Sequence, residues 1–417
     1  MLFRYFTALL AFVSFAYISS GKESDSAFQE KSFDMRSVKN LEYFYEIADG
    51  KRIIFLGEED HKISEFNQLK TQIVSSYKEK NERVVLLFES YIDAAFLGFR
   101  NGAANFQWAD STPKIMPIWD NTENLDLLKE PAEGHSFLIG GIDPQDNSSV
   151  FYKTYQQTPF YKHFKTNHFW NDSLNNRLLY LDSIRFVLQR QRSIVLDENW
   201  KAKDSSSSAF QNFISDCNRL LLDYGQLVKR LPQGHTANEQ IDRVLVQNLP
   251  WDIEVSLNPL IYDALRNKMM AANLNYLADS VFAGWKIIVW AHDLHVMKRD
   301  QDERVKQSIC VYLPKSVMDQ STVFLFNTNC HIKNNGERIE KMGIASSATI
   351  HQYLAAGNES CFFSYLTDKS LWSKQFKRYY WERYTHACHY RPAELCDGIF
   401  YIKDTHTSHF LDKYMHE

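Results

Sequence analysis

The sequence contains little glycine and proline and has no block of lysine and arginine. Its 417 residues include 15 Gly and 10 Pro, and 44% are apolar, which excludes a disordered, collagenous or low-complexity chain. Lys and Arg number 47 against 51 Asp and Glu. A chain without a basic surface is poorly suited to phosphate backbones, so we expect no nucleic-acid partner.

Long apolar runs are also missing, with one exception at the start of the chain. Residues 6–18 are almost all apolar, follow Arg4 and precede the small residues Ser19, Ser20 and Gly21. This is the pattern of a secretory signal peptide, and it is too short for a membrane-spanning helix, which needs ~20 residues. We predict a signal peptide at 1–21, a single α/β domain at 22–417, and a secreted or periplasmic protein with no stable membrane insertion after cleavage.

The six cysteines show none of the C-x₂-C spacing that is typical of a zinc site. Cys310 and Cys361 lie in apolar, strand-like segments and are expected to be buried thiols. Cys388 and Cys396 are the only close pair. In a compartment that permits disulfides, an even number of cysteines leaves the pairing open.

Short apolar runs alternate with segments of helical spacing. Residues 52–57 and 84–88 are strand-like, and residues 63–79 between them place apolar side chains on one helical face, which predicts a βαβ unit. Further strands are predicted at 137–142, 286–290, 322–326, 361–366 and 398–402. Residues 152–258 show helical periodicity instead. The predicted fold is α/β, with a mainly parallel sheet covered by helices on both faces and a helical insertion at about 152–258.

Acidic residues and histidines follow several of these strands. They are Glu58, His61, Glu89, Asp143, His292 and His295. Any one acid alone is explained by the preference of Asp and Glu for helix starts. Because ligands bind at the carboxyl ends of parallel strands, two histidines beside acidic strand ends indicate a catalytic cluster instead.

Five segments, in order along the chain, resemble the erythromycin esterase family. They are Leu56–His61 with Glu65 and Phe66, Trp119 with Glu123, Gly141–Gln145, Arg266–Asn273, and Trp290–His295. The resemblance covers roughly residues 50–145 and 260–405. It implies an esterase-like hydrolase of a small-molecule substrate.

The resemblance also implies roles. His61 is then the general base that activates water against an ester or lactone, and Glu58 and Glu89 orient the base or hold the water. His292 and His295 stabilise the oxyanion or protonate the leaving alcohol. The implied substrate-binding set is Lys70, Trp119, Glu123, Asp143 and Arg266, of which Asp143 and Arg266 organise the site from behind.

The chain departs from the family pattern at four positions. Lys62 stands where the pattern has Gly, Lys70 where it has Arg, Asn267 where it has Asp, and Asp293 where it has Asn. Lys70 keeps a charge without the planar fork that binds a carboxylate through two bonds. These departures leave the substrate open.

There is no G-x-S-x-G elbow, so direct attack by water is favoured over a serine nucleophile. Two alternative functions would use the same cluster of histidines and acids. A metal-dependent hydrolase would hold zinc or another divalent metal on the histidines and glutamates, but H-E-x-x-H spacing is missing, and we therefore expect no cofactor. The third reading is a non-catalytic protein that binds haem or another hydrophobic ligand on this scaffold.

Overall fold

The structure is a computed structural model, and it describes most of the chain from residue 38 to residue 409. The described residues are 38–80, 82–102, 115, 117–119, 121–124, 127–128, 136–145, 152–166, 170–197, 202–257, 262–299, 308–340, 350, 354, 360–379 and 387–409. The predicted signal peptide lies outside them. Within these ranges, no helix combines the length and apolar character needed to cross a membrane.

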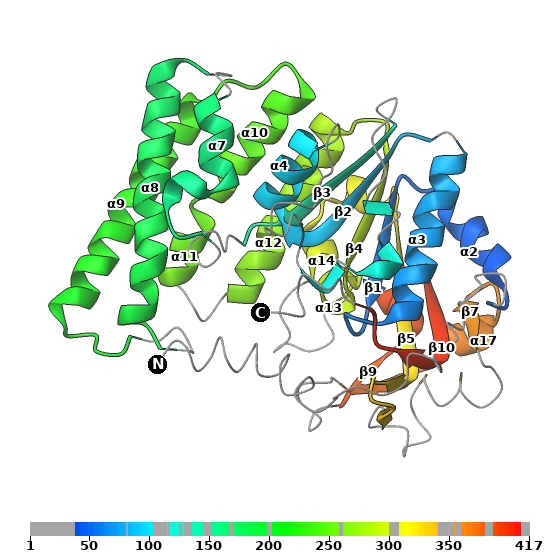
Figure 1. Ribbon diagram of the computed structural model, residues 1–417. Coiled ribbons are helices and arrows are strands. Elements are labelled where there is room, and N and C mark those ends of the chain that lie inside the picture. Colours follow the sequence, from blue (N-terminus) through cyan, green and yellow to red (C-terminus); the bar gives the residue numbers. More distant parts are fainter. Residues whose placement is uncertain are drawn as a thin grey trace, which may run out of the picture.

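An eight-stranded sheet forms the centre of the molecule, with the strand order β3-β2-β4-β1-β5-β10-β7 and with β6 paired to β5 (Figure 1). Its strands are β1 (Ile53–Glu58), β2 (Val84–Tyr91), β3 (Phe137–Asp143), β4 (Lys286–His292), β5 (Ser321–Ile332), β6 (Arg338–Glu340), β7 (Ser360–Ser364) and β10 (Gly398–His406). All neighbours from β3 to β10 are parallel, whereas β7 and β6 run antiparallel to their partners. The predicted mainly parallel sheet is confirmed. A separate pair, β8 (Phe376–Tyr379) and β9 (Ala387–Tyr390), was not predicted.

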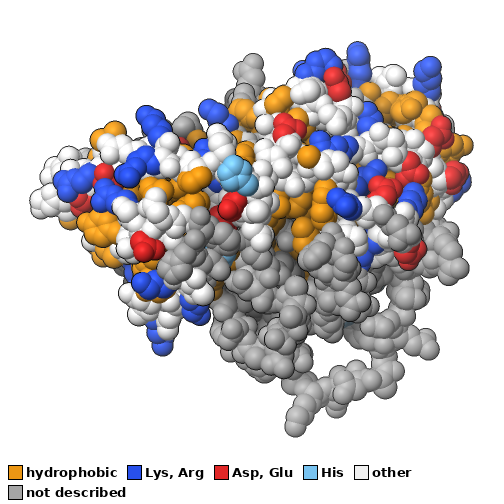
Figure 2. All heavy atoms as spheres, turned by 90° about the horizontal axis from the view of Figure 1, so that it is seen from above, with side chains coloured by type: hydrophobic (Ala, Val, Ile, Leu, Met, Phe, Trp, Pro, Cys, Tyr) orange, Lys and Arg blue, Asp and Glu red, His pale blue; other side chains and the backbone are white. Residues whose placement is uncertain are grey.

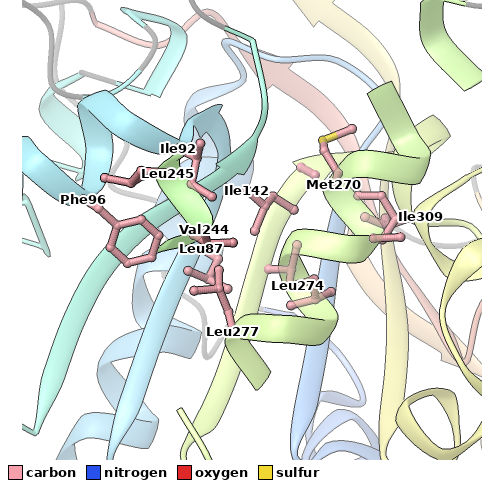
Figure 3. Packing of buried hydrophobic residues seen from close by; sticks show 14 of the residues in the cluster. Leu87, Ile92, Phe96, Ile142, Val244, Leu245, Met270, Leu274, Leu277 and Ile309 are labelled. Carbon is pink, nitrogen blue, oxygen red and sulfur yellow. The ribbon is translucent and has the colours of Figure 1, made fainter. Parts of the chain in front are cut away.

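Helices cover both faces of the sheet, as predicted. Helices α2 (Leu41–Ala48) and α3 (Ser64–Glu79) lie on one face, and α4 (Ile92–Gly102) and α12 (Tyr262–Tyr276) lie on the other. Because successive side chains of a strand point to opposite faces, Leu56 packs in the core with α3 while Phe55 packs in the other core. Figure 3 shows this second core, where Leu87 and Ile142 meet side chains of α4, α10 and α12.

The predicted helical insertion is present beside this second core. It contains η5 (Tyr155–Gln157), α7 (Pro159–Thr166), α8 (Asp172–Val195), α9 (Ser208–Arg230), α10 (Ala237–Asn248) and α11 (Trp251–Leu257). Its buried residues, such as Leu178 and Leu220, continue the core that begins at the sheet. Side chains of both charges are interspersed over the face seen in Figure 2.

Short elements complete the fold around the sheet. They are η2 (Pro117–Trp119), η3 (Thr122–Asn124), the π-helix η7 (Leu277–Val281), α13 (Asp293–Val296), α14 (Ile309–Tyr312), α15 (Lys315–Met318), α17 (Lys369–Trp372) and α18 (Pro392–Leu395). Cys310 and Cys361 are buried free thiols, as expected, and Cys217, Cys330 and Cys396 are three more. The side chain of Cys388 lies outside the described residues.

Candidate active site

The carboxyl ends of four neighbouring strands bring the predicted acids and a histidine to one edge of the sheet. Glu58 of β1 is the register partner of His292 of β4. Glu89 of β2 accepts a hydrogen bond from the backbone N–H of His292 at 2.8 Å. Asp143 ends β3 and shares Arg266 with Glu89. The predicted convergence is therefore found.

A tight turn after β1 returns His61 to this edge. Lys62 has a φ of 70°, in the left-handed region that favours glycine, and its carbonyl accepts from the Ser408 N–H at 2.7 Å. The glycine of the family pattern at this position thus has a conformational reason. The turn leaves His61 Nδ1 2.8 Å from Glu58 Oε1.

Glu58 is buried and receives four hydrogen bonds. Lys70 Nζ donates to Oε2 at 2.6 Å, and the indole N–H of Trp290 donates to the same oxygen at 3.1 Å. His61 Nδ1 and the indole N–H of Trp119 bond to Oε1 at 2.8 and 3.2 Å. The Lys70 ammonium also lies over the ring of Phe326, 4.8 Å from its centroid. The carboxylate is therefore fixed in place before any substrate binds.

The charges of this pair follow from its surroundings. Burial alone would raise the pKa of Glu58, but the ammonium of Lys70 and the hydrogen bond from His61 lower it to about 2. Burial lowers the pKa of Lys70 to about 8, although Glu58 opposes this. Both groups are charged at neutral pH.

Arg266 of α12 is the centre of a second buried group. It donates to Asp143 at 2.6 Å and to Glu89 at 2.6 Å through the same Nη2. Burial would raise the pKa of Glu89, but His295 and Arg266 lower it well below its usual range. Glu89, which we expected to need a buried partner, therefore has one.

His295 is held at both ring nitrogens. Its Nδ1 lies 2.5 Å from Asn267 Oδ1, and its Nε2 lies 3.0 Å from Arg266 Nη1 and 3.1 Å from Glu89 Oε1. Burial lowers the pKa of His295, and this outweighs the opposing effect of Glu89. Nδ1–H donates to Asn267, and Nε2 lies between the Arg266 guanidinium and the Glu89 carboxylate, so both ring nitrogens are engaged by the protein.

His292 has a different environment. Its Nδ1 lies 3.0 Å from Asp293 Oδ1 and 3.2 Å from the Leu294 N–H. Burial alone would lower the pKa of His292, but the carboxylates of Asp293, Glu89 and Glu58 raise it above its ordinary value.

The three histidines form a row along the edge. The ring centroids of His61 and His292 are 5.0 Å apart, and those of His292 and His295 are 6.4 Å apart. Their side chains are 25%, 23% and 14% exposed, in that order, while the carboxylates behind them are almost completely buried. The imidazoles are thus the groups of this cluster that a substrate can reach.

Three residues of the implied substrate-binding set do not face the exposed edge where the histidines lie. Lys70 and Trp119 are fully buried behind Glu58, so neither is placed to contact a substrate in this structure. Glu123 accepts from Ser64 at 2.6 Å and from the backbone N–H of His409 at 3.1 Å, which ties the segment at His409 to α3. Burial of the Lys70 position was not visible from its sequence motif.

Sequence reasoning missed three contributors to the site. Trp290 donates to Glu58, Asn267 orients His295, and Asp293 approaches His292. Each lies next to or within a motif that had been recognised, and Asp293 and Asn267 had been noted as departures from the family pattern. Their positions within or next to these motifs were therefore the only sign in the sequence that these residues belong to the site.

Several of the potential ligating atoms in this cluster are engaged by other groups of the protein. Among the described residues, no group of three or more His, Cys, Asp or Glu is arranged to hold a metal ion. The nitrogens of His295 and the oxygens of Glu58 already have protein partners. The arrangement is better suited to moving protons between imidazoles and water.

Comparisons with known proteins agree with this picture. The family model for erythromycin esterase matches residues 256–405. YbfO of Bacillus subtilis (strain 168), whose name describes it as a hydrolase, is 25% identical in an alignment of 342 residues, and the match covers 70% of this chain and 70% of that protein.

Solved structures share the fold at low identity. A Bacillus cereus protein superposes with a TM-score of 0.67 at 14% identity, covering 91% of this chain and 94% of its own. A mutant of the erythromycin esterase EreC in its open conformation gives 0.61 at 13% identity, covering 90% and 96%. At such identities these likenesses establish the fold alone.

Proposed function

We propose that this chain, whose residues 256–405 match the erythromycin esterase family model, is a hydrolase that cleaves an ester or lactone of a small molecule by direct attack of water. The observation that carries the proposal is the pair formed by His61 and Glu58, with the carboxylate held ionised by Lys70. A histidine oriented by a fixed carboxylate is the arrangement that general-base catalysis requires.

His61 acts as the base in this proposal. With Nδ1–H donating to Glu58, the lone pair of the other ring nitrogen, Nε2, is left to take a proton from water. Among the described residues none forms a hydrogen bond with Nε2. The negative charge of Glu58 then stabilises the imidazolium that forms. General-base help of this kind contributes about 10²- to 10⁴-fold to the rate.

The neighbouring groups supply the remaining steps. His292 lies beside His61 and faces the same edge, so it is placed to donate a hydrogen bond to the oxyanion or a proton to the leaving alcohol. Glu89, Asp143 and Arg266 fix the positions of His292 and His295 from behind. We propose that the reaction needs no metal.

A panel of model esters and lactones tests the proposal. His61→Ala should lower kcat/KM by about 10²- to 10⁴-fold on any substrate that the wild type cleaves. His235→Ala, which removes an exposed histidine of the insertion, should leave turnover unchanged. Full activity in a folded His61→Ala protein would refute the assigned base.

Chelation separates water activation from metal catalysis. Activity that survives exhaustive chelation and disappears with His61 supports the proposal. Loss on chelation with recovery on added zinc would instead make His61 a metal ligand and the nucleophile a metal-bound hydroxide.

We further propose that the chain is exported, because residues 1–21 carry a signal-peptide pattern. The mature N-terminus should lie close to residue 21 or 22. Mass spectrometry of protein from the producing cells checks this, and an intact Met1 on cytoplasmic protein would contradict it.

A further inference from the structure

Asp293 places a buried carboxylate beside His292. Asp293 is 1% exposed, and its Oδ1 lies 3.0 Å from Nδ1 of the His292 imidazole. The resembled pattern has an uncharged amide at this position. This chain therefore differs from the resembled pattern by one negative charge, and that charge lies next to His292.

Two hydrogen-bonding states compete at Nδ1 of His292. When the ring nitrogen carries no proton, it accepts from the Leu294 N–H at 3.2 Å and caps α13. When it carries a proton, the ring is a cation whose Nδ1 lies 3.0 Å from Asp293 Oδ1, within ion-pair distance. One nitrogen cannot accept a hydrogen bond and carry a proton at once, so the charge on Asp293 biases the choice towards the protonated ring.

The other charges around His292 act in the same direction. Glu89 accepts from its backbone N–H, Glu58 is its strand neighbour, and the cations of the cluster are already paired with carboxylates. The groups that face this region are the carboxylates Glu58, Glu89, Asp143 and Asp293, the cations Lys70 and Arg266, and the rings of His61 and His295. Four carboxylates against two cations leave an excess of negative charge in this region, which favours a protonated His292.

We propose that Asp293 is a positioning residue that keeps His292 protonated, so that His292 and not His295 supplies the proton to the leaving group. The catalytic part of this inference rests on the proposed function. His295 is less well placed as the donor, because Asn267 engages its Nδ1 while Arg266 and Glu89 engage its Nε2.

The proton balance is complete within the site. Water attacks the carbonyl carbon and gives a proton to His61 Nε2. The carbon–oxygen bond of the tetrahedral intermediate then breaks, and the leaving oxygen takes the proton of His292 Nε2. His61 ends charged and His292 neutral, and transfer of one proton between the two rings through solvent restores both.

The different basicities of the two histidines agree with proton donation by His292 and not by His295. The pKa of His292 lies above its usual value, whereas that of His295 lies below it. The two rings are 6.4 Å apart and share Glu89 as a neighbour, so the difference arises from their individual partners.

NMR titration of histidine-labelled full-length protein tests the charge state without any substrate. His292→Gln assigns the resonance of His292. Asp293→Asn should lower the pKa of His292 by about 1–3 units, the effect of removing a close opposite charge. Asp319→Asn removes one exposed charge outside the site and should leave the titration unchanged. An equal pKa in wild type and Asp293→Asn would overturn the proposal.

A pH profile tests the catalytic role. In Asp293→Asn, the basic limb of the kcat/KM profile should move to lower pH by the same amount as the pKa of His292 measured by NMR. At a pH above the pKa of His292 in both proteins, each unit of this shift lowers kcat/KM about tenfold. An NMR shift with an unmoved basic limb would refute His292 as the proton donor. If no ester or lactone is cleaved, the proposed hydrolysis fails, and the titration still decides whether Asp293 controls the charge of His292.

Discussion

A single backbone torsion at Lys62 positions the candidate base. The residue adopts a φ of 70°, and its carbonyl is bonded to Ser408, so the turn is fixed from both sides. Non-glycine residues adopt this region at a cost of roughly 1–2 kcal/mol. The chain therefore retains an unfavourable torsion directly next to His61.

A comparison of two variants at this position isolates the backbone effect. Lys62→Gly and Lys62→Ala both lose the lysine side chain, but only glycine relaxes the torsion. We expect the glycine variant to be more stable than the alanine variant by about 1 kcal/mol in urea unfolding. Equal stabilities would show that the turn does not carry this cost.

Glu58 and Lys70 form a buried pair in which loss of one member is costly. Glu58→Gln leaves the Lys70 ammonium buried without its anion, and we expect a loss of about 3–5 kcal/mol in the free energy of unfolding. Replacing Lys70 by Met in the same chain should recover part of the loss. Asp319→Asn, in an exposed ion pair, should cost at most about 1 kcal/mol.

The effect of Glu58 on stability depends on pH with a defined sign. The folded pKa is about 2 and the ordinary value is 4.5, so the unfolded chain takes up the proton first as the pH falls. The stabilisation is complete above pH 4.5 and is lost as the pH falls through about 2. Unfolding of wild type and Glu58→Gln should therefore converge over this window, and a constant difference would contradict the assignment.

Among the elements, α13 depends on a glycine in β1. A Cβ at Gly57 would lie 2.5 Å from Val296 Cγ2 and 3.0 Å from Asp293 Cα, so the helix rests directly on the strand. This contact fixes His292, which precedes the helix, and His295, which lies within it.

Gly57→Ala tests this contact. Overpacking of this kind costs about 1–3 kcal/mol, and displacement of α13 should also reduce hydrolysis. Gly225→Ala is the matched control, because no heavy atom lies within 4 Å of its added Cβ and alanine favours the helix α9. Thermal unfolding of both variants measures the difference. An unchanged melting temperature in Gly57→Ala would show that the helix can shift.

The strands and the convergence of polar strand ends were predictable because both depend on local patterns. Runs such as 84–88 are apolar throughout, as buried parallel strands require, and parallel strands bring their ends to one edge. The burial of Lys70 was not predictable, because it results from Trp290 and Phe326 on two other strands closing over it. Long-range contacts of this kind leave no trace in the local spacing of residues.

At the scale of the whole molecule, the insertion is joined to the sheet by apolar packing and by a pair of amides. Asn248 of α10 and Asn273 of α12 exchange two hydrogen bonds of 2.9 Å, and Asn273 also donates to the Ile142 carbonyl next to Asp143. The insertion is thus linked through Asn273 of α12 to the strand that ends at the site, while the charged and imidazole groups of the site come from outside the insertion.

The buried thiols give a test of the packing as a whole. Burial raises the pKa of Cys217 to about 12 and that of Cys361 to about 11, which removes the reactive thiolate at neutral pH. Cys217, Cys310 and Cys361 should resist alkylation in the native protein and react fully in urea, as read by peptide mass spectrometry. A native disulfide at any of the three would contradict the structure.

The two indole groups that donate to Glu58 give this protein an internal reporter. Trp119 and Trp290 are two of nine tryptophans, and both N–H groups are buried against one carboxylate. Their indole proton resonances and fluorescence depend on whether that carboxylate is charged. The state of the site can therefore be followed by spectroscopy while its substrate is still being sought.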